Sequence, residues 1–189
     1  INTALLDMNV AIDLGIPFIF SSHSIGPIDN EHVYELKKAR LIVCREPETY
    51  NNIESLGINS VKSADFAFNF PFHLYIKHVF SNKKICLLIL RSNNFSYNDI
   101  YINKNTNIVI GDYEIHRKNY DEILLSTSDW SKDAKFIKNL SNKTGLKYAE
   151  FNDIKSIVNI INSSSIVISD RYHPLICAYC LGKEIKIIS

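Results

Sequence analysis

The sequence predicts an α/β fold with two parallel-sheet domains, because short apolar strands alternate with amphipathic helices along most of the chain. Residues 4–14 carry apolar side chains at the spacing of a helix. The uninterrupted apolar runs 41–44 and 85–90 are typical of strands that are buried on both faces of a parallel sheet. An irregular, Phe-rich segment over residues 66–81 interrupts this alternation and separates two blocks of elements.

The first block consists of three helices and three strands, and Gly15 and Gly57 mark the expected ends of two of the helices. The apolar run 17–21 is short and uncharged, as expected for a buried strand. In chain order we expect a helix over 4–14, a strand over 17–21, a helix over 31–39, a strand over 41–44, a helix over 46–56 and a strand over 59–62.

The second block has the same alternation, with Ser131 and Asp153 as expected N-caps and Gly145 and Gly182 as expected helix stops. Residues 93–122 are polar and rich in Asn, and only 108–110, followed by Gly111, indicates a short strand and turn there. The other strands are expected over 84–90, 123–126, 147–151, 166–168 and 185–188, and the helices over 131–144, 153–162 and 172–181.

These blocks predict a first Rossmann-like domain over residues 1–68, a linker or crossover over 69–82 and a second Rossmann-like domain over 83–189. The aromatic side chains of the linker would pack either at a seam between the domains or against the side of one of them. The chain opens on a helix already under way and stops on a strand. We therefore expect that the first domain is truncated at its N-terminus and the second at its C-terminus.

Composition excludes several classes of function. Lys and Arg number 21 against 20 Asp and Glu, so the net charge of +1 lacks the basic excess of a nucleic-acid-binding module. No apolar run is long enough for a membrane span. Glycine-rich nucleotide motifs are absent, and no His, Cys or carboxylate cluster indicates a metal site. The four cysteines lie in apolar stretches, which favours a reducing, cytoplasmic compartment.

The strongest candidate site is the segment 169–174, with sequence SDRYHP, between an expected strand and helix. Pro174 suits a first helical turn, whose N–H groups and dipole favour an anion. The guanidinium of Arg171 can bind a phosphate or carboxylate through two hydrogen bonds, and His173 can donate a hydrogen bond or move a proton. The alternative is that Arg171 pairs with Asp170 and that His173 caps the helix.

Two weaker candidates lie in the first block. Arg45 ends a strand at the edge where ligands bind, but it could equally pair with the acidic residues Glu46 and Glu48 in the next helical turn. Asp65, at the end of the block, would either face a cleft or cap a turn. The loop 21–27 would either line a pocket or only connect two elements. Its candidate pocket residues are Ser22, His23, Ser24 and Gly26.

Taken in order, these motifs resemble the polysaccharide pyruvyl transferase family over nearly the whole chain. The resemblance rests on S-I-G-P at 24–27, R-E-x-x-T at 45–49, L-G-I at 56–58, A-D-x-A-F at 64–68 and S-x-R-x-H at 169–173. The R-x-H element is the most specific single piece. His23 departs from the family pattern, which often has Gln at that place.

The resemblance implies a two-domain fold similar to GT-B glycosyltransferases. It also implies transfer of a pyruvyl group from phosphoenolpyruvate to a sugar hydroxyl of a cell-surface polysaccharide or its precursor. By position, the resemblance associates Arg45, Arg171 and His173 with the donor, and we expect the neighbouring Tyr172 to contact it too. Arg171 and His173 are the expected catalytic residues, with His173 as an acid or an anion-binding donor at the leaving phosphate.

The implied partners are phosphoenolpyruvate as donor substrate and a glycan or lipid-linked sugar as acceptor, with no further cofactor. The implied location is the cytoplasm, including the inner face of the membrane. Two alternatives remain open at this point. One is a GT-B glycosyltransferase that uses a nucleotide sugar, and the other is an inactive fragment that retains an anion site.

Overall fold

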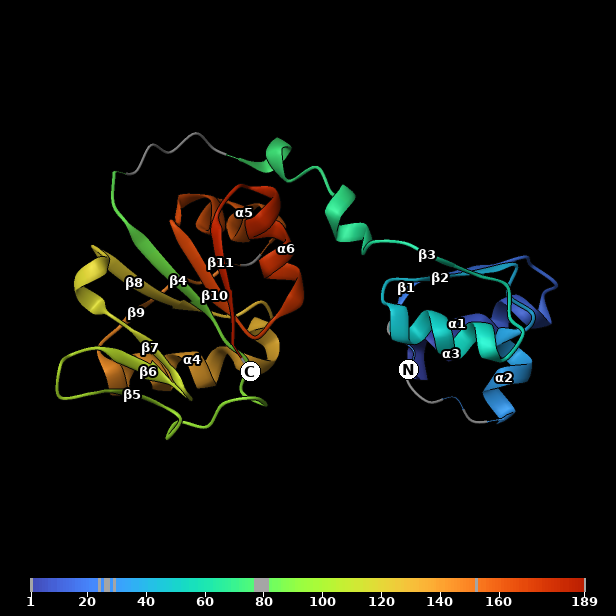
Figure 1. Cartoon of the computed structure of the whole chain (residues 1–189), viewed down its shortest axis with the longest axis horizontal. Helices are drawn as coiled ribbons and strands as arrows, with labels where there is room; N and C mark the ends of the chain where they lie inside the picture. Colours follow the sequence, from blue (N-terminus) through green and yellow to red (C-terminus); the bar gives the residue numbers. More distant parts are fainter. Residues whose placement is uncertain are drawn as a thin grey trace. The chain divides into compact units, whose positions relative to one another are not determined.

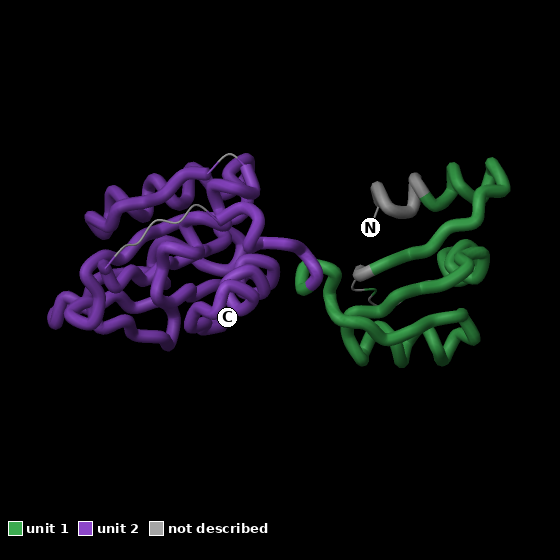
Figure 2. Tube along the Cα trace, turned by 90° about the horizontal axis from the view of Figure 1, so that it is seen from above, with its two compact units in different colours: residues 1–68 green, residues 69–189 purple. Residues whose placement is uncertain are grey.

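The computed structural model describes residues 2–23, 25, 28, 30–76, 82–151 and 153–188. It divides into two compact units, Ile1–Phe68 and Asn69–Ser189 (Figure 2). Each unit contains its own parallel sheet and its own buried apolar core. The prediction of a mixed α/β fold with parallel sheets is therefore confirmed.

Unit 1 is a three-stranded parallel sheet in the order β1-β2-β3. Its core is formed around Ile42 and Cys44 of the central strand and Ile53 of the third helix, all of which are buried. The strands are β1 (Ile19–His23), β2 (Leu41–Cys44) and β3 (Ser60–Lys62), and the helices are α1 (Asn2–Asp13), α2 (Asn30–Leu36) and α3 (Pro47–Ser55).

Unit 2 contains a five-stranded parallel sheet in the order β11-β10-β4-β8-β9. From the central strand β4 the chain proceeds outward through β8 and β9, and then returns to the other side of β4 for β10 and β11. The order therefore reverses between β4 and β10, which is where open α/β sheets bind ligands. The strands are β4 (Ile85–Ile89), β8 (Glu122–Ser126), β9 (Lys147–Tyr148), β10 (Ile166–Ser169) and β11 (Glu184–Ile187).

Alternate side chains of β4 pack on opposite faces of this sheet. Cys86 and Leu88 contribute to one core, shared with α4 (Trp130–Thr144), and Leu87 and Ile89 contribute to the other, shared with α5 (Ile154–Ser163) and α6 (Tyr172–Cys180). Figure 1 shows α5 and α6 together on one side of the sheet. Because β4 is buried on both faces, it appears in the sequence as a continuous apolar run.

A small antiparallel sheet takes the place of the helix that usually follows the first strand of such a fold. It consists of β5 (Ile100–Ile102), β6 (Ile108–Ile110) and β7 (Tyr113–Ile115). Gly111, with a φ of 54°, turns the chain between β6 and β7, as its place after 108–110 predicts. Ile100, Ile108 and Ile115 bury this sheet against the same core as α4.

The Phe-rich segment forms two short 3-10 helices, η1 (Phe66–Asn69) and η2 (Phe72–Tyr75). Phe72 is buried against the α5–α6 side of unit 2, with Phe70 and Tyr75 packed beside it. Residues 77–81 lie outside the described part of the chain. The described aromatic side chains from Phe70 to Tyr75 therefore cover the side of unit 2.

One of the two expected helix caps is correct. The carboxylate of Asp153 accepts a hydrogen bond from the backbone N–H of Ser156 at 2.7 Å and so caps α5. The cap predicted at Ser131 is wrong, because α4 begins at Trp130 with Asp129 as its N-cap, and the Ser131 hydroxyl donates to the Asp129 carboxylate instead. No described helix is both long enough and apolar enough to cross a membrane.

Candidate functional site

The turn between β10 and α6 is held against the carboxyl end of β4 by one buried hydroxyl. Ser169 Oγ donates to the carbonyl of Ile89 at 2.7 Å and accepts from the backbone N–H of Arg171 at 2.9 Å. Arg171 has extended backbone as the N-cap of α6, without a side-chain cap bond. The segment 169–173 is thus positioned at the reversal point of the sheet.

Asp133, in the first turn of α4, joins the carboxyl ends of three neighbouring strands. Its Oδ1 accepts from the backbone N–H and hydroxyl of Ser92, which follows β4, at 3.1 and 2.7 Å. Its Oδ2 accepts from the hydroxyl of Thr127, which follows β8, at 3.0 Å, and pairs with Nη2 of Arg171, which follows β10. The Asp133 side chain is 2% exposed.

Burial by itself would raise the pKa of the Asp133 carboxyl. The hydrogen bonds from Ser92 and Thr127 and the charge of Arg171 outweigh burial, so the pKa lies below its ordinary value. Asp133 is therefore ionised at neutral pH, and it fixes the Arg171 guanidinium from behind.

A second arginine, Arg91, lies at the same edge. Its Nε is 3.6 Å from Oδ2 of Asp170, and its Nη2 donates to the Asp170 carbonyl at 3.5 Å. The Asp170 side chain is 1% exposed, and this burial raises the pKa of its carboxyl, although the charges of Arg91 and Arg171 oppose the change. The alternative in which Arg171 pairs locally with Asp170 is wrong, because each arginine pairs with a different carboxylate.

Several polar atoms of this cluster have no hydrogen-bond partner among the described residues, although they are buried. They are Nε of Arg91, Nε of Arg171 and both carboxylate oxygens of Asp170. Orphaned buried polar groups are uncommon in folded proteins and mark places where structure is maintained for another reason. Here they surround the reversal point of the sheet, where ligand binding is expected.

The cluster offers positive charge and donors to an anion. Each guanidinium has five N–H donors, and the contacts with Asp133 and Asp170 use only some of them. The Arg91 and Arg171 side chains are 38% and 19% exposed. Tyr172 and His173 are exposed in the first turn of α6, with their rings 6.1 Å apart. This arrangement can bind a phosphate or carboxylate group and bring an imidazole beside it.

Arg91, Ser92, Thr127 and Asp133 are members of the cluster that the sequence analysis did not identify. For Arg91 a signal was present, since it closely follows β4, the most apolar strand of the chain. Arg45 and Arg171 follow β2 and β10 in the same way. For Asp133 no local signal exists, because a carboxylate in the first turn of a helix is common.

In unit 1, Arg45 follows β2 and Asp65 follows β3. Nη1 of Arg45 is 2.9 Å from Oδ2 of Asp65, and the two side chains are 25% and 5% exposed. Oδ1 of Asp65 accepts from the backbone N–H of Ala67 at 2.9 Å. Asp65 therefore caps the turn that leads into η1 and also binds Arg45.

The structure describes only part of the segment 21–27, which contains the candidate pocket residues at the end of β1 and in the loop after it. Ser22 and His23 lie in β1, but their side chains are outside the described part. Ser24 and Gly26 lie outside the described residues. Within this loop, Ile25 is held by the buried hydroxyl of Thr49, which accepts from the Ile25 N–H at 3.2 Å.

We expect Thr49→Val to lower the free energy of local opening at Ile25 by about 1–3 kcal/mol, because the isosteric side chain leaves the N–H of Ile25 without its acceptor. Hydrogen exchange of the Ile25 amide, followed by NMR, measures the change. Ser55→Ala, which removes a hydroxyl from the exposed end of α3, serves as the control and should leave Ile25 unchanged. Equal exchange of Ile25 in wild type and Thr49→Val would show that the hydroxyl does not hold the loop.

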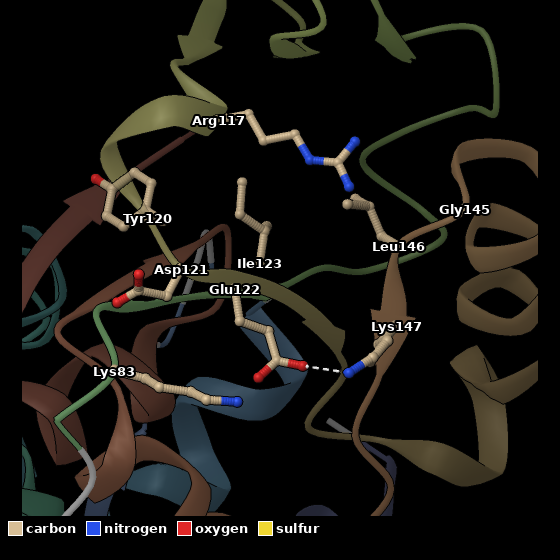
Figure 3. Close-up of a pocket in the computed structure, with 9 residues that line it drawn as sticks. All are labelled: Lys83, Arg117, Tyr120, Asp121, Glu122, Ile123, Gly145, Leu146 and Lys147. Atoms are coloured by element: carbon tan, nitrogen blue, oxygen red, sulfur yellow. Dashed lines mark hydrogen bonds and ion pairs between the residues drawn. The ribbon is translucent and has the colours of Figure 1, made fainter.

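A hollow of about 230 Å³ lies at the opposite edge of the second sheet (Figure 3). Its lining includes Glu122 and Lys147, at the starts of β8 and β9, which form an ion pair at 2.9 Å. In Figure 3 the Arg117 side chain extends toward Leu146 above this pair. Because ligands of such sheets bind beyond the carboxyl ends of the strands, we do not assign the function to this amino-terminal edge.

Among the described residues, no three His, Cys, Asp or Glu side chains gather in a way that could hold a metal ion.

A family model described as polysaccharide pyruvyl transferase matches residues 3–185 of the 189-residue chain. A search of curated proteins finds no match. The matched range includes the three arginine–aspartate pairs and every motif on which the resemblance rests.

Proposed function

Because the chain belongs to the polysaccharide pyruvyl transferase family, a family of enzymes, we propose that it transfers a pyruvyl group from phosphoenolpyruvate to a sugar hydroxyl of a cell-surface polysaccharide or its precursor. The observation that carries this proposal is the pair Arg91 and Arg171 at the reversal point of the second sheet. Phosphoenolpyruvate carries a phosphate and a carboxylate, and planar guanidinium groups match both.

In this proposal Arg171 and Arg91 bind the two anionic groups of the donor. Asp133 orients the Arg171 guanidinium, and Asp170 orients that of Arg91. Two sugar hydroxyls add to C2 of the donor, the bond from C2 to the phosphate oxygen breaks, and a pyruvate ketal and inorganic phosphate result. One hydroxyl proton goes to C3 of the donor and the other leaves on phosphate. His173 is suited to donate the proton to the departing phosphate, since it is exposed beside Arg171.

The resemblance also associates Arg45 with the donor, and we retain Arg45 and Tyr172 as proposed contacts. Arg45 is oriented by Asp65, as Arg171 is by Asp133. Tyr172 is 53% exposed at the start of α6. We further propose that the two units are the Rossmann-like domains of a GT-B-like transferase. All four cysteines are free, which supports a cytoplasmic location.

Calorimetric titration with phosphoenolpyruvate tests the donor site. We expect Arg171→Ala and Arg91→Ala each to weaken binding by about 1.5–3 kcal/mol, the range for hydrogen bonds to charged groups, and Arg45→Ala to weaken it in the same direction. Arg117→Ala removes an exposed arginine at the opposite edge of the same sheet and should bind like wild type. Arg171→Lys keeps the charge opposite Asp133 and separates lost binding from lost folding.

Two results would contradict the donor assignment. The first is a wild-type protein that binds a nucleotide sugar and not phosphoenolpyruvate, which would indicate a glycosyltransferase. The second is an Arg117→Ala variant that loses as much affinity as the cluster variants, which would show that binding follows overall charge and not this site.

A further inference from the structure

A second hollow, of about 490 Å³, lies at the carboxyl edge of the sheet in unit 2, beyond the ends of β8 and β9. It belongs to neither the arginine cluster nor the hollow at the opposite edge. Its lining includes Ser128, Asp129 and Trp130, which follow β8, and Phe151, Asp153 and Ile154, which follow β9.

The wall of this hollow is aromatic and apolar. The rings of Trp130 and Phe151 lie 6.2 Å apart, edge to face at 81°, and Ile154 lies beside them at the start of α5. Trp130 is supported from another direction by Tyr148, with ring centroids 6.0 Å apart. Two perpendicular rings form an apolar corner, in which a ring-shaped ligand can stack on one ring while its edge contacts the other.

The polar lining of the hollow consists of the carboxylates of Asp129 and Asp153 and the hydroxyl of Ser128, and Asp129 is also paired with Lys132 at 3.3 Å. Hydrogen bonds from Ser131 hold the pKa of the Asp129 carboxyl below its ordinary value, and hydrogen bonds from Ser156 do the same for Asp153. An ionised carboxylate only accepts hydrogen bonds and has about four acceptor positions. Their remaining acceptor positions suit the hydroxyl donors of an uncharged ligand.

We propose that this hollow is a sugar-binding subsite, in which a neutral pyranose ring packs in the corner between Trp130 and Phe151 and donates hydroxyl hydrogen bonds to Asp129 and Asp153. A pyranose has apolar C–H faces and a rim of hydroxyls, which matches this surface. Naming the bound sugar as the acceptor glycan rests on the proposed function, but binding of a sugar in the hollow does not.

The hollow and the arginine cluster are joined by a short hydrogen-bonded path. The backbone N–H of Asp129 donates to Oγ1 of Thr127 at 3.2 Å, and that hydroxyl donates to Asp133 at 3.0 Å. Asp133 in turn pairs with Arg171. One segment, the loop after β8, therefore borders the aromatic hollow on one side and supports the arginine–aspartate cluster on the other. The two proposed sites are thus connected through a single loop.

Trp130 is the only tryptophan of the chain, so its fluorescence reports directly on this hollow. The probes are the methyl glycosides of glucose, galactose, mannose and N-acetylglucosamine, and uracil as a non-sugar ring. We expect a saturable change in Trp130 emission with at least one glycoside. Phe151→Leu and Asp153→Asn should weaken that binding by about fivefold or more, whereas Asp112→Asn, an exposed carboxylate elsewhere in unit 2, should not. Asparagine preserves the cap of α5, so Asp153→Asn tests the charge and not the helix.

The inference is overturned if no glycoside gives a saturable change up to about 50 mM, well above the ~1 mM range of weak ligands. It is also overturned if uracil saturates the signal and the glycosides do not. Phosphoenolpyruvate calorimetry on the same preparation separates the two proposals. Donor binding without sugar binding rejects the subsite alone, and sugar binding without donor binding rejects the proposed phosphoenolpyruvate donor alone.

Discussion

Replacing Asp133 with alanine is expected to lower the free energy of unfolding of unit 2 by about 3–5 kcal/mol, the cost of breaking a buried ion pair by removing one partner. The change removes one acceptor from Ser92, Thr127 and Arg171 together, and the Arg171 side chain is only 19% exposed. Urea unfolding followed by the emission of Trp130 measures the loss, because this reporter lies at the start of the same helix.

The pH dependence of stability gives a sharper test with Asp133→Asn, which preserves the shape and removes the charge. The pKa of Asp133 is lower in the folded state than the ordinary carboxyl value of about 3.9. The contribution of the Asp133 charge to folding stability is therefore fully present above about pH 3.9 and is lost as the pH falls through the folded-state pKa. The stability gap between wild type and Asp133→Asn should be constant above about pH 5 and shrink below about pH 4.

Asp112→Asn is the matched control for this series, because Asp112 is an exposed carboxylate of unit 2. It should leave stability within about 0.5 kcal/mol of wild type. A gap for Asp133→Asn that stays the same down to about pH 2 would mean that the charge of Asp133 does not contribute. A loss below about 1 kcal/mol for Asp133→Ala would mean that the three strand ends do not depend on it.

The sequence predicts β4 and β10 well because burial on both faces leaves a continuous apolar run, whereas β2 alternates between half-buried and buried residues. The run 41–44 coincides with β2, and the run around β4 differs from the strand only at its ends. The antiparallel sheet β5-β6-β7 was largely missed because each of its strands has only three residues. A period of two cannot be recognised over so short a run, and polar Asn-rich connections hide the buried Ile side chains between them.

The part of the candidate site that could be predicted consists of residues whose place between a strand and a helix marks them as ligand-binding candidates. Arg45 and Arg171 were found because they follow strands and precede helices, at the edge where ligands bind. Their partners were not found, because they depend on contacts across the fold. Asp133 is 38 residues from Arg171 and 41 residues from Ser92 in the sequence, and only the neighbouring positions of β4, β8 and β10 bring them together.

The wrong cap at Ser131 has a related cause. Asp129 and Ser131 are both good N-cap residues two positions apart, and local preference does not separate them. In the structure Asp129 takes the cap position and Ser131 donates to it. This choice places Trp130 at the first helical position and so shapes the wall of the second hollow.

His173→Gln is expected to have the largest effect on turnover, a decrease in kcat of about 10²–10⁴-fold, the usual contribution of a positioned general acid. Glutamine still donates a hydrogen bond but cannot deliver a proton, so affinity for phosphoenolpyruvate should change far less than kcat. Release of inorganic phosphate, with the tightest-binding glycoside as acceptor, gives kcat, and calorimetry gives the affinity.

The matched control is His73→Gln, which changes an exposed histidine of η2 and should leave kcat unaltered. The split between rate and affinity decides the role of His173. If kcat and affinity fall together by the same factor, His173 only binds the anion that Arg171 and Arg91 already hold. If kcat alone falls, the proton at the leaving phosphate comes from the first turn of α6. The R-x-H spacing then has a physical basis, because it places a fixed cation and a proton donor two residues apart on one helical turn.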